Sequence, residues 1–258
     1  MKMNRGCSTA RRKPGPFKIG SISAASSRAL RGCLAVCVVV TCVAASQPAV
    51  AQAPPAPVSP PARFLVVLDA AHGGDDPGGR LSNGQPEKTF TLALSIRLRS
   101  LLGARGIQVV TTRESDATVA PNRRAEIANH ANAQACLSLH ASESGSGIHL
   151  FASSLAPAQP ARFPAWKTAQ AAWVTRSLAL AGVLNSALLH AGMNVTLGRI
   201  ALPAIDSMTC PAIAIEIAPE RVPGHPSAAE LDDPAYQARV AEAVAAALLE
   251  WRTEAHQP

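Results

Sequence analysis

Between Phe64 and Trp251, short apolar runs alternate with longer segments whose apolar residues recur at helical spacing. Short apolar runs predict buried strands, and apolar residues three and four positions apart predict amphipathic helices. The predicted strands are Val66–Leu68, Ile107–Thr111, Ala135–Leu139, Ile148–Ala152 and Ala212–Ile217. The predicted helices are Pro86–Arg105, Pro121–Asn132, Pro234–Trp251 and one or two helices within Trp166–Ala191, followed by loop and a short strand over Gly192–Pro203. Strands that alternate with helices indicate an α/β sandwich around a mostly parallel sheet.

The first 51 residues differ from the rest in charge and hydropathy. They carry eight basic residues and no acidic residue, and they include the apolar run Cys33–Ala45. This run is shorter than the roughly 20 residues that span a bilayer, and Ala49-Val50-Ala51 fits a small-x-small cleavage site. We therefore predict a signal peptide over residues 1–51 and a periplasmic or secreted protein, with an uncleaved N-terminal anchor as the alternative. Residues 52–63 then form a Pro/Ala-rich linker, and residues 64–254 form the single folded domain.

The net charge of +7 comes from this N-terminal segment. Without residues 1–51 the chain keeps 24 − 8 = 16 basic residues against 17 acidic residues, a net charge of −1. Aromatic residues make up only 3% of the sequence. A nearly neutral domain with few aromatic residues argues against a nucleic-acid partner.

Only two of the six cysteines, Cys136 and Cys210, lie outside the predicted signal peptide. Two cysteines in an exported protein can form a disulfide. Two buried free thiols are the alternative, and the sequence leaves both open.

The loop after the first predicted strand carries the first candidate for chemistry. His72 follows the apolar run, and Glu87 begins the next helix after a loop rich in glycine and proline. Both residues belong to the carboxyl edge of the first strand, where open α/β sheets place their sites. Imidazole and carboxylate are ligands that suit zinc (Zn²⁺), and a catalytic zinc needs a third protein ligand. As the ordinary alternative, Glu87 is a carboxylate favoured by the helix dipole.

His140 and Glu216 are the downstream candidates. His140 ends the predicted strand CLSLH and is the candidate third ligand, although a single histidine at a strand end is usually not a ligand. Glu216 is the one charge in AIAIEIA. An unpaired carboxylate is costly to bury, so Glu216 must pair, ligate or line a cleft. A salt bridge with an arginine is the structural interpretation, and a general base beside a zinc site is the functional one.

Four sequence segments carry a resemblance to a known family, and they occur in the order in which that family has them. They are VVLDAAHGGDDPGG with GQPEK, RRAEIAN, CLSLHAS and MTCPAIAIEIAPE. Together they resemble the zinc-dependent N-acetylmuramoyl-L-alanine amidase family, which cleaves bacterial peptidoglycan. The resemblance implies a three-layer α/β sandwich of the phosphorylase/hydrolase-like type, with a mostly parallel mixed sheet flanked by helices. It also implies zinc on His72, Glu87 and His140, with Glu216 as the catalytic residue. Arg124 and Asn129 match a helix motif of the family, which we interpret as structural.

This chain differs from the family at three places. The family usually has Gly where this chain has Ala71, and Asn or Asp where it has Ser142. It commonly has Gly-Phe where this chain has Ala218-Pro219. These differences affect loops beside the site and leave the ligands intact. A non-catalytic peptidoglycan-binding or regulatory relative and a zinc peptidase acting on stem peptides are therefore the alternatives. We expect peptidoglycan as the partner and a monomer, and the need for a protein activator stays open.

We also make predictions for the other polar residues near the site. Asp69, near the end of the first strand, is expected to orient His72. Asp75 and Asp76 are expected to be solvated loop residues. His149 is expected on the surface or on a cleft wall.

Overall fold

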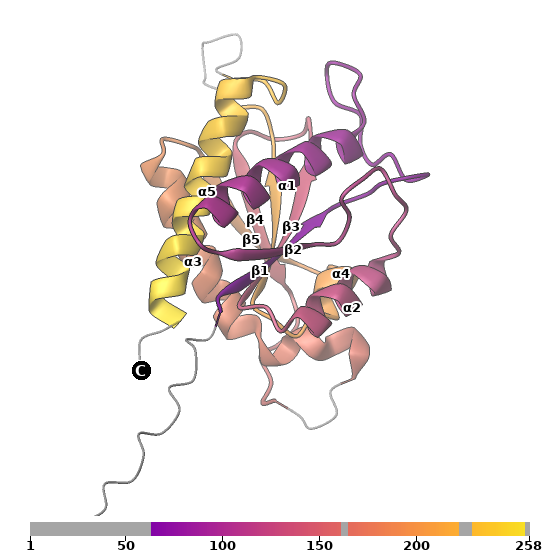
Figure 1. The fold of residues 1–258 in the computed structure, drawn as a ribbon, viewed down its shortest axis with the longest axis vertical. Helices are drawn as coiled ribbons and strands as arrows, with labels where there is room; N and C mark the ends of the chain where they lie inside the picture. Colours follow the sequence, from indigo (N-terminus) through magenta and orange to yellow (C-terminus); the bar gives the residue numbers. More distant parts are fainter. Residues whose placement is uncertain (1–62, 161–164, 222–228, 256–258) are drawn as a thin grey trace, which may run out of the picture. The chain divides into compact units, whose positions relative to one another are not determined.

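The computed structural model describes residues 63–160, 165–221 and 229–255. The predicted signal peptide and nearly all of the predicted linker lie outside these residues. Within them, six strands form one sheet in the order β2-β1-β3-β6-β4-β5 (Figure 1). The strands are β1 (Leu65–Ala70), β2 (Gln108–Thr111), β3 (Ala135–Ala141), β4 (Ile148–Ser153), β5 (Val195–Ile200) and β6 (Ala212–Ile217). The pairs β1–β2, β1–β3, β3–β6 and β4–β5 are parallel, whereas β4 runs antiparallel to β6.

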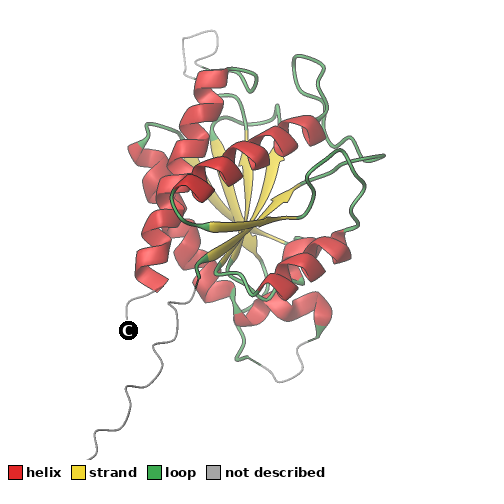
Figure 2. Cartoon of the chain, in the orientation of Figure 1, coloured by secondary structure: helices red, strands yellow, loops and turns green. Residues whose placement is uncertain are grey.

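Helices cover both faces of this sheet, as Figure 2 shows. They are α1 (Glu87–Ala104), α2 (Pro121–Ala131), the 3-10 helix η1 (Trp166–Ala172), α3 (Val174–His190), α4 (Pro203–Asp206) and α5 (Pro234–Ala255). The three-layer sandwich with a mostly parallel mixed sheet is thus confirmed. The short helix α4 was not predicted, because a four-residue helix is too short to show a periodic pattern.

The periodic residues of α1 explain why this helix packs where it does. Phe90, Leu94, Leu98 and Leu102 are all buried and lie on one side of the helix. The helix ends where Gly106 takes a φ of +72°, a conformation that glycine adopts without steric cost. The amide of Ile107 then donates to the carbonyl of Leu102, which leads the chain into β2.

The two faces of the sheet bury different side chains. One face packs large aliphatic residues against α1, α3 and α5, among them Leu68, Leu137, Ile215 and Leu150. The other face packs small strand residues, among them Cys136, Ala212 and Ala214, against α2 and α4, and α2 contributes Ala125 and Ala128 to this contact. We call these the aliphatic face and the small-residue face. Since side chains alternate along a strand, each strand contributes to both faces.

A disulfide joins Cys136 on β3 to Cys210, which precedes β6. Both cysteines are buried on the small-residue face. The alternative of two free thiols is therefore wrong.

Within the described residues, no single helix is both long and apolar enough to cross a bilayer. Only η1 and α3 taken together pass that test by length and composition, and they are bent by 64° relative to each other.

Candidate active site

The predicted ligands His72, Glu87 and His140 meet at the carboxyl edge of the sheet. Nε2 of His72 lies 3.1 Å from Oε2 of Glu87, and Nδ1 of His140 lies 3.1 Å from Oε1 of the same carboxylate. One ligand atom from each residue lies within 4.8 Å of the other two. The two imidazole rings stand edge to face, with centroids 5.5 Å apart. Three residues from separate elements therefore converge on one point.

Each of the three residues is positioned by a different local structure. β1 ends at Ala70, so His72 lies in the loop two residues after the strand. His140 is the penultimate residue of β3, which is longer than predicted. Glu87 is the first residue of α1, after Pro86 in extended conformation. Its side chain bonds within the site, although the helix dipole also favours a carboxylate at this position.

The backbone at His72 is strained and is held by two buried arginines. His72 has a φ of +60°, a left-handed conformation that is uncommon outside glycine. Arg124 donates from Nη1 to the carbonyl of Ala70 and from Nη2 to that of His72, at 2.7 and 2.6 Å. Arg113 donates from Nη2 to the carbonyl of Ala71 at 3.1 Å. These contacts hold a conformation that costs of order 1–3 kcal/mol and that accumulates at functional sites.

The second nitrogen of each histidine also has a partner. Nδ1 of His72 lies 2.8 Å from Oδ2 of Asp76, and Nε2 of His140 lies 3.4 Å from the hydroxyl of Ser138. That hydroxyl donates to Asp69 at 2.7 Å, so it can accept from His140. Partners of this kind select the tautomer whose other nitrogen is free to bind a metal.

The expectation for Asp69 is wrong. Asp69 does not bond to His72; it forms a salt bridge with Arg124 at 2.6 Å and accepts from Thr112 and Ser138. Asp76 is exposed, as expected of a solvated loop residue, and it is also the acid that contacts His72. Its location four residues after His72, in a glycine-rich loop, was the signal that could have identified it. The structural interpretation of Arg124 is confirmed by its contacts. Asn129 likewise bonds to the backbone of Ser207 and Thr209.

The electrostatics of the site keep Glu87 and Asp76 ionised. Burial alone would raise the pKa of Glu87, but the His140 imidazole and the backbone amides of Gly79 and Ala141 outweigh it, so this pKa lies below its ordinary value. The hydrogen bond with His72 lowers the pKa of the exposed Asp76 carboxyl. Both groups are therefore carboxylates at neutral pH, as metal coordination and histidine orientation require.

Glu216 lies beside the three-residue cluster on the small-residue face. It pairs with His140 across β3–β6 and with His149 across β4–β6, so the three side chains form a row. Within the described part of the chain, the Glu216 carboxylate makes no hydrogen bond or ion pair, so the salt-bridge interpretation finds no support. Glu216 lines a pocket of about 300 Å³ together with Glu87, His140 and Arg80. A half-buried carboxylate in such a pocket is available to move a proton.

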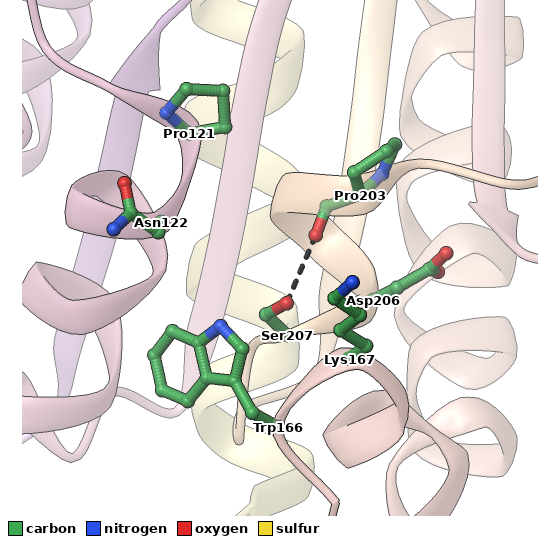
Figure 3. A pocket seen from close by; sticks show the side chains of 7 residues that line it. All are labelled: Pro121, Asn122, Trp166, Lys167, Pro203, Asp206 and Ser207. Carbon is green, nitrogen blue, oxygen red and sulfur yellow. Dashed lines mark hydrogen bonds between the residues drawn. The ribbon is translucent and has the colours of Figure 1, made fainter.

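A larger pocket, about 460 Å³, lies elsewhere on the molecule (Figure 3). It is lined by Trp166 and Lys167 of η1, by the start of α2 and by α4, and the indole of Trp166 faces its interior. None of the four predicted site residues lines it. Size alone does not identify an active site, and the convergent titratable groups lie in the smaller pocket.

The fold and the convergent groups define an α/β protein with a candidate metal centre at the carboxyl edge of its sheet. The family model of N-acetylmuramoyl-L-alanine amidases matches residues 66–250, and the chain belongs to this family.

Relatives with known names agree with this assignment. The chain is 38% identical over 82 residues to the sporulation-specific N-acetylmuramoyl-L-alanine amidase of Bacillus subtilis, covering 31% of this chain and 32% of the relative. It is 40% identical over 77 residues to the amidase AmiA of Escherichia coli, covering 30% and 27%. The matched segment thus spans about a third of the length of these curated relatives.

A solved structure resembles the whole described domain. The catalytic domain of CwlV, an N-acetylmuramoyl-L-alanine amidase from Bacillus (Paenibacillus) polymyxa, aligns with a TM-score of 0.58 at 25% identity. The alignment covers 74% of this chain and 98% of that domain. The folds therefore correspond over nearly all of the solved domain.

Proposed function

We propose that this protein hydrolyses the amide bond between the lactyl group of N-acetylmuramic acid and L-alanine in peptidoglycan, with zinc as the metal. The observation that carries the proposal is the convergence of His72, Glu87 and His140 beside the carboxylate of Glu216, which makes no hydrogen bond or ion pair with any described residue. Family membership supports the choice of bond. Two histidines and one carboxylate form a ligand set used by catalytic zinc, which leaves one position open.

The distances are compatible with one zinc ion at this centre. Zinc binds nitrogen and oxygen at about 2.0–2.2 Å, so two ligand atoms on a tetrahedral ion lie roughly 3.3 Å apart. The separations from Oε2 of Glu87 to His72 and from Oε1 of Glu87 to His140 are both 3.1 Å, and one ligand atom from each residue lies within 4.8 Å of the other two. Small side-chain adjustments would therefore let all three residues bind one ion. The partners of the second histidine nitrogens, Asp76 and Ser138, support the same assignment.

When bound, zinc would supply a Lewis acid that polarises the amide carbonyl and lowers the pKa of water. We assign the proton transfer to Glu216. Its carboxylate accepts a proton from the attacking water and then delivers it to the nitrogen of L-alanine as the amide bond breaks. Glu87 and Asp76 stay ionised throughout, because their pKa values are held below the ordinary range. Arg113 and Arg124 keep the His72 backbone in place.

We further propose that residues 1–51 direct export and are removed, so that residues 64–254 act in the periplasm or outside the cell. The basic segment, the apolar run and Ala49-Val50-Ala51 support this proposal. N-terminal sequencing of the protein recovered outside the cytoplasm tests it. A mature chain that still begins near Met1 would refute it.

The decisive experiment combines metal analysis with product identification. The purified protein should contain one zinc ion per chain, should lyse purified peptidoglycan and should lose this activity on treatment with a chelator. Mass spectrometry should show free L-alanine amino groups on the released peptides. His140→Ala should lose both zinc and activity. Bound zinc without lysis would support a non-catalytic wall-binding protein, and cleavage inside the stem peptide would support a peptidase.

A further inference from the structure

The pocket that contains Glu87, His140 and Glu216 also contains one cation, Arg80. The other charged residues that line it, within the described part of the chain, are Glu87, Glu143 and Glu216. An arginine that faces a pocket of carboxylates ordinarily forms an ion pair with one of them. Arg80 forms no ion pair with any described residue.

The structure holds Arg80 in place without occupying most of its guanidinium. Its backbone pairs with Pro86 in an isolated bridge, and the amide of Leu81 donates to the carbonyl of Gln85. Nη1 donates to the carbonyl of Gly84 at 2.8 Å. Guanidinium has five N–H donors. Within the described residues the bond to Gly84 is the one that it makes, so most of its donors are free on an exposed side chain at the pocket wall.

The backbone of Arg80 lies close to the metal centre, and Arg80 lines the same pocket as Glu87 and His140. The amide of Gly79, the preceding residue, donates to Oε2 of Glu87 at 2.9 Å. Consecutive Cα atoms are about 3.8 Å apart, so the Arg80 side chain starts one residue from a group that bonds to a proposed zinc ligand. A substrate group bound by Arg80 would therefore lie in the pocket that two of the proposed ligands also line.

We infer that Arg80 is a specificity-determining residue that binds a free carboxylate on the stem peptide. The inference rests on the proposed function. The lactyl side of the scissile amide carries no carboxylate, whereas the residue after L-alanine is a γ-linked glutamate with a free α-carboxylate. That carboxylate lies at most about 7 Å from the scissile nitrogen, because each residue spans at most about 3.3–3.6 Å. A planar fork of N–H donors matches it in bidentate geometry.

The contact has an electrostatic consequence for substrate choice. With zinc bound, Glu87 is paired with the metal, and Glu143 and Glu216 are the remaining carboxylates of the lining. They would repel an anionic substrate group placed beside them, whereas Arg80 would attract it. Amidation of the substrate carboxylate removes its charge and one of its two acceptors. The protein should therefore distinguish stem peptides whose second residue is a free acid from those in which it is amidated.

The test uses two muramoyl tripeptides that differ only at this group. Both contain L-alanine, γ-linked D-glutamate and L-lysine, and in one the α-carboxylate is a primary amide. Wild-type zinc-loaded protein should cleave the acid with a kcat/KM about 10- to 100-fold above that of the amide, the range expected for a charge-assisted hydrogen-bonded pair. Arg80→Ala should lose this preference, because its kcat/KM should fall for the acid tripeptide and stay at the wild-type value for the amidated one. Arg80→Lys should keep part of it, since lysine retains the charge without the fork.

Matched measurements separate this role from loss of structure. Arg97→Ala, at an exposed arginine of α1 outside the pocket lining, should leave both rates unchanged. Arg80→Ala should bind one zinc ion and melt at the wild-type temperature. Two outcomes overturn the inference and leave the proposed function standing. One is an equal loss of kcat/KM on both tripeptides in Arg80→Ala. The other is a wild-type protein that lyses peptidoglycan but cleaves the acid and the amide equally well. Failure of the wild-type protein to release peptide from purified peptidoglycan overturns both.

Discussion

β6 presents two different faces over six residues. Ile213, Ile215 and Ile217 point to the aliphatic face and are at most 1% exposed. Ala212, Ala214 and Glu216 point to the small-residue face, where α2 and α4 pack. The same strand therefore supplies large apolar surface on one side and a reactive carboxylate on the other.

This difference separates the residues that stabilise the fold from those that carry the proposed chemistry. The aliphatic face is continuous with α1, α3 and α5 and holds the larger set of buried side chains. On the small-residue face, polar groups replace aliphatic packing toward the carboxyl edge, where Asp69, Arg124 and Ser138 form a buried network beside the site. A change on the aliphatic face should alter the free energy of unfolding, and a change near the site should alter activity.

The largest effect is expected from Glu216→Gln. Loss of the group that moves protons should lower kcat on peptidoglycan about 10²- to 10⁴-fold. Zinc content should stay at the wild-type level because Glu216 is not in the ligand cluster. The free energy of unfolding should be equal or higher, since an unpaired, half-buried charge is removed. A variant with full activity would show that another group carries the proton.

The next largest effect is expected from Gly78→Ala. An alanine Cβ there would lie 2.6 Å from Cδ2 of His72 and 2.7 Å from Oε2 of Glu87, so both ligands must move. We expect zinc affinity to fall at least about 10-fold, the size of effect seen when groups that orient metal ligands are changed. Competition with a chromophoric chelator measures this affinity.

Gly192→Ala is the matched control for this variant. Gly192 has a φ of +77° against +67° for Gly78, and an added Cβ would meet nothing within 4 Å. Both variants carry a similar backbone cost of roughly 1–2 kcal/mol, but only Gly78→Ala disturbs the metal centre. Equal zinc affinity in the two variants would place the metal elsewhere.

The smallest effect is expected from Ile215→Val, on the opposite face of β6 from Glu216. Removal of one buried methylene should lower the free energy of unfolding by about 0.5–1.5 kcal/mol. Denaturant titration measures this loss, and kcat should stay within about twofold of the wild type. A large loss of activity with unchanged stability would mean that the two faces are not independent.

His72, His140 and Glu216 could be proposed from the sequence because each interrupts or follows an apolar strand pattern, whereas Glu87 is an ordinary first-turn carboxylate that stood out only beside them. Glu216 is a charge within an apolar strand, and His72 and His140 follow apolar runs at positions where sheets place their sites. Asp76 could not be assigned, because an aspartate in a glycine-rich loop looks the same whether it faces solvent or an imidazole. Asp69 was assigned to the wrong partner for a related reason: its contact, Arg124, is 55 residues away in the chain.

The sequence by itself determined the order of strands and helices, the apolar stripe of α1 and the identity of the four candidate site residues. These depend on periodicity and on residue chemistry, which are local. Tertiary structure alone decided that Cys136 pairs with Cys210, that β4 lies antiparallel to β6, and that Arg80 shares a pocket with Glu216. Each of these depends on how segments distant in the chain pack against one another, and such packing leaves no periodic trace in either segment.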